Sequence, residues 1–474
     1  MIKINKGIKA SVIYTISSLI NKGINFITIP IFTRIMTTEQ IGIVNTYSSW
    51  HSIFSVIACL SLTAGSFSVA MHQYKESRSE YQSSVLGLTI VSSAVLTIIY
   101  VLFFNQINKL LGLPWQLNVL MVAGFFLQPA TDFWMARQRF EYKYKICALV
   151  SSVTAIVSSI FAVLTVLYLN KNGLTNLAIG RLYATYVVNY LVAIVIFVSV
   201  FKEGKVFYDK EYWKFGITLS LPLIIHTLSK QILDVSDRIM IQKMIGYSAV
   251  GIYGTLYSIS SLSLIVWNSI NMSLVPFTFS NLEEGSEGEK KLNSVAIPVV
   301  LIFGVAAILF AFLSPEIVKI IATDEYYEAV YMVPPVAAGI YFTALYNLMG
   351  NVLLYHKKTK YIMYATIIAA AVNVGLNYIF IQIYGYMAAA YTTLFSNIVL
   401  AVSQYLMAKK VHGNIPYNSK YLFIISLSVT LIVLSCNILY AYSLIRYLTI
   451  GIILITVFIL REKIINLLRR MIKE

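Results

Sequence analysis

Few side chains in this 474-residue sequence could do chemistry, and the most informative is a lysine within an apolar segment. Lys22 has no carboxylate three or four residues away, so no neighbour on the same helix neutralises it. A charge at membrane depth is costly and by default marks a functional site or a structural pair. Polar residues recur around it at helical spacing: Ser11, Thr15, Ser18, Lys22 and Asn25. This stripe predicts a helix face that lines a water-filled cavity. The alternative is that Lys22 extends its ammonium group to the membrane interface or pairs with a distant aspartate.

A second charged stripe lies further along the chain. His226, Lys230 and Asp234 are spaced four residues apart, and Asp237 continues the same helix face. Asp234 can neutralise Lys230 within one helix, so a local ion pair that stabilises the helix is the first interpretation. The alternative is that Lys230 is the counterpart of Lys22 in a binding site.

Some of these groups could carry protons or a coupling ion. Imidazole titrates near neutral pH, which makes His51 and His226 candidates, together with Asp234 and Asp237. A lone histidine in a helix is more often a hydrogen-bonded interior residue. Asp132 is not among the candidates, because its place five residues before Arg137 predicts a position at the membrane interface.

Two arginines could bind an anion. Arg34 and Arg238 follow apolar segments at their predicted outer ends. A guanidinium group can bind phosphate through two parallel hydrogen bonds, whereas a lysine acts as a point charge. The alternative for both residues is a solvated loop cation.

The composition and the missing motifs exclude several classes of protein. The chain is 58% hydrophobic and 12% charged, against roughly 45–50% and 25% in soluble proteins. It contains no P-loop, HExxH or GxSxG motif and no Cys/His cluster, so we expect no ATP site, metal centre or cofactor beyond a coupling H⁺ or Na⁺. The net charge of +16 is spread over short clusters between apolar runs, which argues against a nucleic-acid partner.

Apolar segments of about 20 residues predict an all-α integral membrane protein with about 14 transmembrane helices. If the N-terminus is cytoplasmic, 26 Lys and Arg residues fall inside and 8 outside, which favours cytoplasmic N- and C-termini. The predicted helices lie near residues 10–32, 41–64, 82–104, 116–136, 146–169, 177–200, 214–237, 249–278, 294–314, 329–354, 361–383, 386–408, 420–440 and 444–461.

The chain contains an internal repeat. Lys22 precedes Gly42 by 20 residues, and Lys230 precedes Gly251 by 21 residues. Six helices return the chain to its starting side, so two such units insert in the same orientation, with a substrate site between them. The repeat predicts two pseudo-symmetric six-helix lobes around a central cavity, at residues 1–204 and 205–410. Two additional transmembrane helices and a basic cytoplasmic tail occupy residues 411–474.

Several short motifs resemble bacterial oligosaccharide flippases, the O-antigen and capsule transporters of the multidrug/oligosaccharidyl-lipid/polysaccharide (MOP) exporter superfamily. The resemblance spans roughly residues 5–410. The motifs that carry it are Pro30–Arg34, Glu39–Gly42, Ala136–Phe140, Asp237–Arg238, Val250–Tyr253 and His356–Lys360.

The resemblance implies a transporter, without enzyme activity, in the bacterial cytoplasmic (inner) membrane. Such a protein flips polyprenyl-diphosphate-linked oligosaccharide to the periplasmic leaflet by alternating access, for lipopolysaccharide or capsule synthesis and in contact with other polysaccharide assembly proteins. Basic residues of the first helices bind the diphosphate in related flippases, which corresponds here to Lys22 and Arg34, with Lys230 in the other lobe. The alternatives are a multidrug or cation antiporter of the same superfamily and a membrane glycan polymerase or acyltransferase.

Overall fold

The computed structural model describes the backbone of residues 6–473; the side chains of residues 6–12, 14–16, 25, 64, 265–266 and 463–473 lie outside the described set. The predicted all-α membrane architecture is confirmed, because the described elements are helices, with no strand among residues 6–473. Each of the fourteen predicted segments is largely helical, but those near 41–64, 82–104 and 249–278 are interrupted. Nine described helical segments are long and apolar enough to cross a membrane, so the chain is a multi-pass membrane protein.

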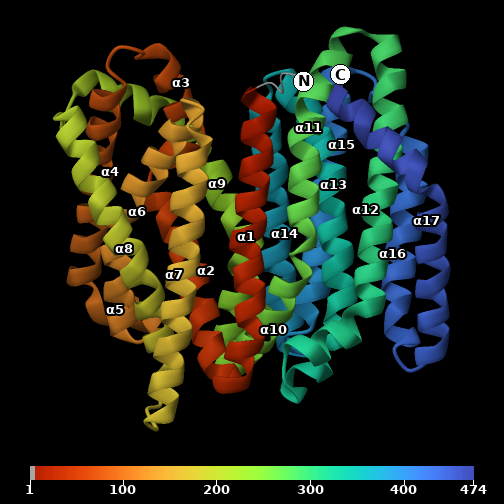
Figure 1. The fold of residues 1–474 in the computed structure, drawn as a ribbon, viewed down its shortest axis with the longest axis horizontal. Helices are drawn as coiled ribbons and strands as arrows, with labels where there is room; N and C mark the ends of the chain where they lie inside the picture. Colours follow the sequence, from red (N-terminus) through yellow and green to blue (C-terminus); the bar gives the residue numbers. More distant parts are fainter. Residues whose placement is uncertain (1–5, 474) are drawn as a thin grey trace. The chain divides into compact units, whose positions relative to one another are not determined.

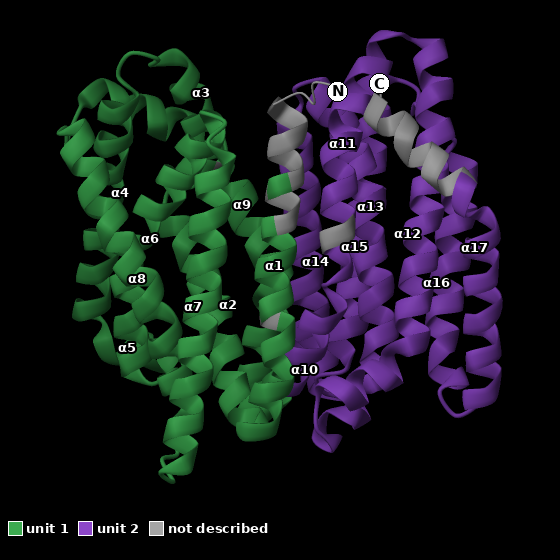
Figure 2. Cartoon of the chain, in the orientation of Figure 1, with its two compact units in different colours: residues 1–251 green, residues 252–474 purple. Residues whose placement is uncertain are grey.

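The chain divides into two compact units, residues 1–251 and 252–474 (Figure 2). The predicted lobe boundary after residue 204 stays a prediction. Unit 1 extends beyond residue 204 because α9 packs against α2, α3 and α4. A short segment, residues 205–209, joins the two helices, since α8 ends at Gly204 and α9 begins at Lys210.

Unit 1 is a bundle of long helices with two short helices, α3 and α5, at its opposite ends (Figure 1). Within it, α8 packs against α4, α6 and α7, and α1 packs against α7. Its elements are α1 (Lys6–Ile35), α2 (Thr38–Ala58), η1 (Leu62–Ala64), α3 (Ser66–Gln73), α4 (Arg78–Leu102), α5 (Phe104–Leu111), α6 (Trp115–Phe140), α7 (Tyr144–Lys171), α8 (Leu177–Gly204), α9 (Lys210–Met244) and the first turn of α10 (Tyr247–Ser260).

The start and the end of α2 have clear local causes. Thr37 and Gln40 form a capping box, in which each side chain accepts a hydrogen bond from the backbone N–H of the other residue. The prediction of one helix over 41–64 is wrong at its end. Leu60 and Ser61 have a φ of 49°, the left-handed conformation in which helices commonly end, and the chain restarts as η1 and α3.

Two glycines bring α2 and α10 into backbone contact. A Cβ at Gly42 would lie 1.9 Å from the Tyr247 carbonyl oxygen, and a Cβ at Gly251 would lie 1.9 Å from the Thr38 carbonyl oxygen. Only glycine fits at either position. These are the two glycines of the predicted repeat, so the repeated residues meet each other in the structure.

Unit 2 is built around α13, which packs against α15, α12, α16 and α11. At the end of the bundle where α17 starts, Arg446 of α17 forms an ion pair with Glu316 of α12. The elements of unit 2 are the rest of α10, α11 (Ser263–Glu283), α12 (Ser286–Ile321), η2 (Asp324–Met332), α13 (Val333–Tyr355), α14 (Thr359–Tyr384), α15 (Ala388–His412), α16 (Ser419–Leu439) and α17 (Ser443–Lys473).

The single helix predicted over 249–278 is wrong, because α10 ends at Ser260 and α11 begins at Ser263. Four serines cluster at this break, and each hydroxyl donates to a carbonyl three or four residues earlier. Such bonds compete with the helix ladder and bend helices. The serines are Ser258, Ser260, Ser261 and Ser263.

Candidate functional site: a polar cavity in unit 1

Unit 1 contains a partly open cavity of about 810 Å³, and most of the residues that line it are polar. Six helices contribute to its wall, α1, α2, α6, α7, α8 and α9. Polar residues are tolerated inside a membrane bundle where they line a water-filled space or pair with one another. The polar wall includes Ser48, His51, Ser52, Ser55, Gln128, Thr131, Asp132, Ser151, Thr154, Ser158, Ser159, Arg181, Thr185, Asn189, Thr227 and Gln231.

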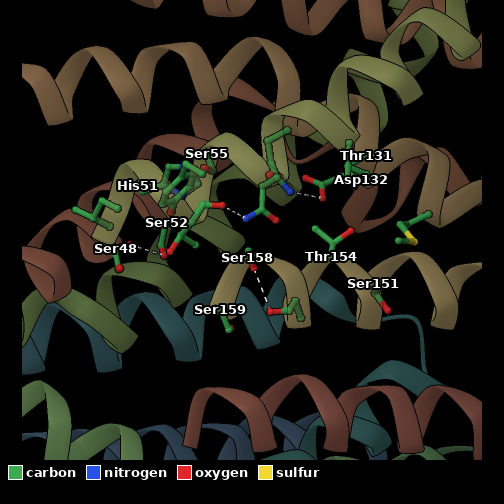
Figure 3. Close-up of a pocket in the computed structure, with 18 of the residues that line it drawn as sticks. Ser48, His51, Ser52, Ser55, Thr131, Asp132, Ser151, Thr154, Ser158 and Ser159 are labelled. Carbon is green, nitrogen blue, oxygen red and sulfur yellow. Dashed lines mark hydrogen bonds between the residues drawn. The ribbon is translucent and has the colours of Figure 1, made fainter. Parts of the chain in front are cut away.

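The hydroxyl groups of the cavity come from opposite sides. Figure 3 shows residues 151–159 of α7 along one side, with Ser52 and Ser55 of α2 and Thr131 of α6 across from them. Ser52 donates to the Ser48 carbonyl oxygen at 2.8 Å, and Ser158 donates to the Ala155 carbonyl oxygen at 3.2 Å. These hydroxyls keep lone pairs that can accept hydrogen bonds from water or a ligand.

Asp132 is the carboxylate of this cavity. Its Oδ1 accepts a hydrogen bond of 3.0 Å from Gln128 Nε2, one turn earlier on α6. No Lys, Arg or His in the described part of the chain forms a salt bridge with it. A carboxylate in such a site can hold a proton or contribute oxygen ligands to a monovalent cation.

His51, on α2, lines another part of the same cavity. Its Nδ1 is 3.4 Å from the Ser55 hydroxyl oxygen. The imidazole is surrounded by aromatic rings, with ring centroids 5.9 Å from Tyr47, 5.3 Å from Tyr186 and 6.5 Å from Phe125. His51 therefore borders the cavity on one side and an aromatic cluster on the other.

Arg181 supplies a positive charge to the cavity. Its guanidinium carbon lies 3.7 Å from the ring centroid of Phe32, which also lines the cavity. Stacking over an aromatic face stabilises a guanidinium group and fixes its plane. The wall thus carries an acid on α6, an imidazole on α2 and a cation on α8.

The predicted anion-binding residues of α1 lie elsewhere. Lys22 is half-buried, forms no ion pair among the described residues and does not line the cavity of unit 1. Arg34 is exposed, and its Nη1 donates to the Pro30 carbonyl oxygen at 2.9 Å. The Asn25 side chain lies outside the described residues. The binding roles of these residues stay predictions.

The predicted residues of α9 differ in exposure and in their hydrogen-bond partners. Lys230 forms the expected ion pair with Asp234, and both side chains are partly exposed. Asp237 is 1% exposed and its Oδ1 accepts from the Arg238 backbone N–H at 2.8 Å. His226 has a buried Nδ1 without a hydrogen-bond partner among the described residues. Among the predicted site residues whose side chains the structure describes, His51 lines the cavity of unit 1 and the others do not.

Sequence reasoning missed most of the cavity. Asp132, expected at the interface, lines it, as do Gln128 and Arg181. The signal for Asp132 was its spacing from Gln128, which puts two polar side chains on one face of an apolar helix. A similar signal on α7 is the spacing of Ser151, Thr154 and Ser158, which share a helix face.

Comparisons with known families match most of the chain. Residues 8–283 match the family model described as polysaccharide biosynthesis protein, and residues 222–379 match the MatE model. An uncharacterized membrane protein of Haemophilus influenzae is 23% identical over 375 residues, which cover 78% of this chain and 89% of that protein.

The chain is also similar to solved structures. The lipid II flippase MurJ in an inward closed conformation has a TM-score of 0.68 at 16% identity, covering 96% of this chain and 100% of that one. A multidrug resistance MATE family transporter of the MOP superfamily, in an inward-facing conformation, has a TM-score of 0.63 at 15% identity, covering 85% and 97%. A MOP superfamily transporter from Pyrococcus furiosus has a TM-score of 0.59 at 16% identity, covering 85% and 95%. At these identities the likeness shows a shared fold.

Proposed function

Because the chain belongs to the polysaccharide biosynthesis protein family of the MOP superfamily, we propose that it flips a polyprenyl-diphosphate-linked oligosaccharide across the bacterial inner membrane by alternating access. The match of residues 8–283 to the family carries this proposal. The fold shared with MurJ supports it, since that protein is a flippase of lipid II.

The physical requirements of such a substrate fit the residues of this chain. A polar glycan cannot cross about 30 Å of hydrocarbon unaided, whereas its polyprenyl tail can remain in lipid. Half-buried Lys22 offers a cation for the diphosphate, with Arg34, Lys230 and Arg238 as further candidates. Outward movement of negative charge from a negative cytoplasm is downhill by about 2.3 kcal/mol per charge per 100 mV.

A deletion strain complemented with variants tests this function. We expect Lys22→Ala to abolish surface glycan at normal protein level, Lys22→Arg to retain part of it, and Lys171→Ala, an exposed lysine of α7, to behave as wild type. The measurement is the mass of the lipid-linked intermediate that accumulates. Full glycan export by Lys22→Ala would remove Lys22 from the mechanism, and no accumulated lipid-linked glycan in the deletion strain would overturn the function itself.

One observation favours a second candidate function, a multidrug or cation antiporter. A cationic drug requires a carboxylate in a cavity, and Asp132 provides one in unit 1. Drug susceptibility of the deletion strain separates the two functions. A flippase deletion changes surface glycan, whereas an antiporter deletion lowers the tolerated concentration of cationic compounds.

The orientation is part of the proposal. We infer cytoplasmic N- and C-termini from the excess of basic residues on one side. Reporters fused after Gly112 and Tyr384 should then be periplasmic, and a reporter fused after Lys410 cytoplasmic. A cytoplasmic reporter after Gly112 would contradict this orientation.

A further inference from the structure

A groove in unit 2 combines an apolar floor with a lysine at one end. Three helices, α13, α15 and α16, enclose a volume of about 440 Å³. It is lined by Phe342, Leu345, Met349, Ala401, Val402, Tyr405, Ser419, Lys420, Leu422, Phe423 and Ser426.

The floor of the groove is part of the protein core, and its walls are exposed. Phe342, Leu345 and Met349 of α13 are at most 8% exposed, as is Leu422 of α16. Val402 is 51% exposed on α15, and Phe423 is 68% exposed on α16. Because α15 and α16 belong to a membrane bundle, a groove with such walls opens toward lipid chains.

Positive charge gathers at one end of the groove. Lys420 lines it within the first turn of α16 and is exposed. Lys409 is also exposed and follows Tyr405 by one helical turn of α15, which places it on the face that Val402 and Tyr405 share. This is the end of the bundle that the distribution of basic residues predicts to be cytoplasmic, where the membrane surface carries anionic lipids.

The length of the groove indicates which lipid it takes. Its lining on α16 runs from Ser419 to Ser426, roughly 11 Å at about 1.5 Å per residue. One leaflet contributes about half of the ~30 Å hydrocarbon core. The groove therefore suits one acyl chain that reaches down from the headgroup level, and it is short for a polyprenyl tail.

We propose that this groove is a binding site for an anionic phospholipid of the inner leaflet, with one acyl chain against α13 and the phosphate beside Lys420 and Lys409. Basic pockets between membrane helices bind anionic headgroups in this way. The site is independent of the transported substrate, because it concerns a resident lipid.

Native mass spectrometry of the purified full chain tests the proposal. The probes are phosphatidylglycerol and phosphatidylethanolamine with identical acyl chains. We expect one phosphatidylglycerol to be retained at least tenfold more tightly than phosphatidylethanolamine. We expect Lys420→Gln to weaken it about fivefold, since one lysine near the surface contributes about 1 kcal/mol.

Two further variants complete the design. Val402→Trp fills the groove from an exposed position and should abolish the bound lipid without lowering the melting temperature. Lys360→Gln is the matched control, because Lys360 is exposed at the predicted cytoplasmic end of α14 and does not line the groove.

Specific outcomes overturn the proposal. Equal retention of the two phospholipids would show that the groove does not recognise charge. Equal weakening by Lys420→Gln and Lys360→Gln would assign the effect to diffuse attraction. A polyprenyl phosphate that displaces phosphatidylglycerol, and is itself lost in Val402→Trp, would assign the groove to the transported lipid class. None of these outcomes would contradict the proposed glycan flipping, which is tested separately by the accumulated lipid-linked intermediate.

Discussion

The interiors of the two units differ. In unit 1, six helices surround a polar cavity of about 810 Å³. In unit 2, α13 runs through the core, and 89% of the apolar stretch within Asp324–Tyr355 is buried. Serine and threonine face inward on α2 and α7, whereas Ala337, Ala338 and Ala344 let neighbouring helices approach α13 closely. Units of similar size therefore use small residues in different ways, to line a polar cavity in one unit and to allow close helix packing in the other.

The largest expected effect concerns the ion pairs. Arg446 is 3% exposed and pairs in unit 2 with Glu316, whose side chain is 31% exposed, whereas Lys230 and Asp234 are 37% and 41% exposed in unit 1. Removing one partner of a buried pair costs roughly 3–5 kcal/mol. We expect Arg446→Gln to lower the melting temperature far more than Lys230→Gln does. Equal melting temperatures of the two variants would show that the two ion pairs contribute equally to stability, despite their different burial.

Matched enlargements test the packing directly. Ala344 is 0% exposed in α13, and Ala155 lines the cavity on α7. We expect Ala344→Leu to cost about 1–3 kcal/mol by overpacking, and Ala155→Leu to leave the melting temperature unchanged while slowing transport. A similar loss of stability in both variants would indicate that the cavity of unit 1 is as tightly filled as the core of unit 2.

The cavity carboxylate should affect transport more than stability. Asp132→Asn keeps the shape and removes the charge, and we expect about a tenfold fall in glycan export, equivalent to about 1.4 kcal/mol. Asp324→Asn is the control, because Asp324 is exposed in η2 of unit 2. The export rate is measured from accumulated lipid-linked intermediate; unchanged export by Asp132→Asn would exclude the carboxylate from transport.

A double-mutant cycle measures the pair in α9. Because both side chains are partly exposed, we expect a coupling energy below about 1 kcal/mol between Lys230 and Asp234. Lys230→Gln should be less stable than Lys230→Gln/Asp234→Asn. Additive effects in thermal unfolding would show that the two residues do not stabilise each other.

The smallest effect is a pH dependence in unit 2. Burial lowers the pKa of His356, and His412 and Lys358 lower it further. His356 Nε2 lies 2.7 Å from His412 Nδ1. The other ring nitrogen of His412, Nε2, lies 3.8 Å from Glu289 Oε1. The unfolded chain then binds a proton more readily than the folded chain, so stability is complete above about pH 6.5 and falls below it.

His356→Gln should flatten this dependence. The measurement is the melting temperature at pH values from 7.5 down to 5.5. We expect the melting temperature of the wild type to fall slightly more over this range than that of the variant. Parallel curves would show that protonation of His356 does not contribute to stability in this range.

The helices could be predicted from the sequence, and their breaks could not. Hydropathy reports the position and length of apolar runs, and each of the fourteen predicted segments is largely helical. The end of α2 depends on the left-handed conformation of Leu60 and Ser61, and the break before Ser263 depends on serine hydroxyls that bond back to carbonyls. Neither changes the hydropathy of the segment.

The cavity could be predicted least of all. Its wall combines side chains separated by up to 203 residues, from Thr28 to Gln231, and helix packing alone brings them together. Local spacing does predict a local pair, as for Lys230 and Asp234. It cannot predict that Asp132 of α6 and His51 of α2 border the same space.

The contact between Gly42 and Gly251 is reciprocal. Each glycine lies against the carbonyl that precedes the other glycine by four residues, so the contact is self-complementary. Self-complementary contacts are the kind that form across a twofold axis between identical molecules. A larger side chain at either glycine would therefore strike the backbone of the other helix at an equivalent place.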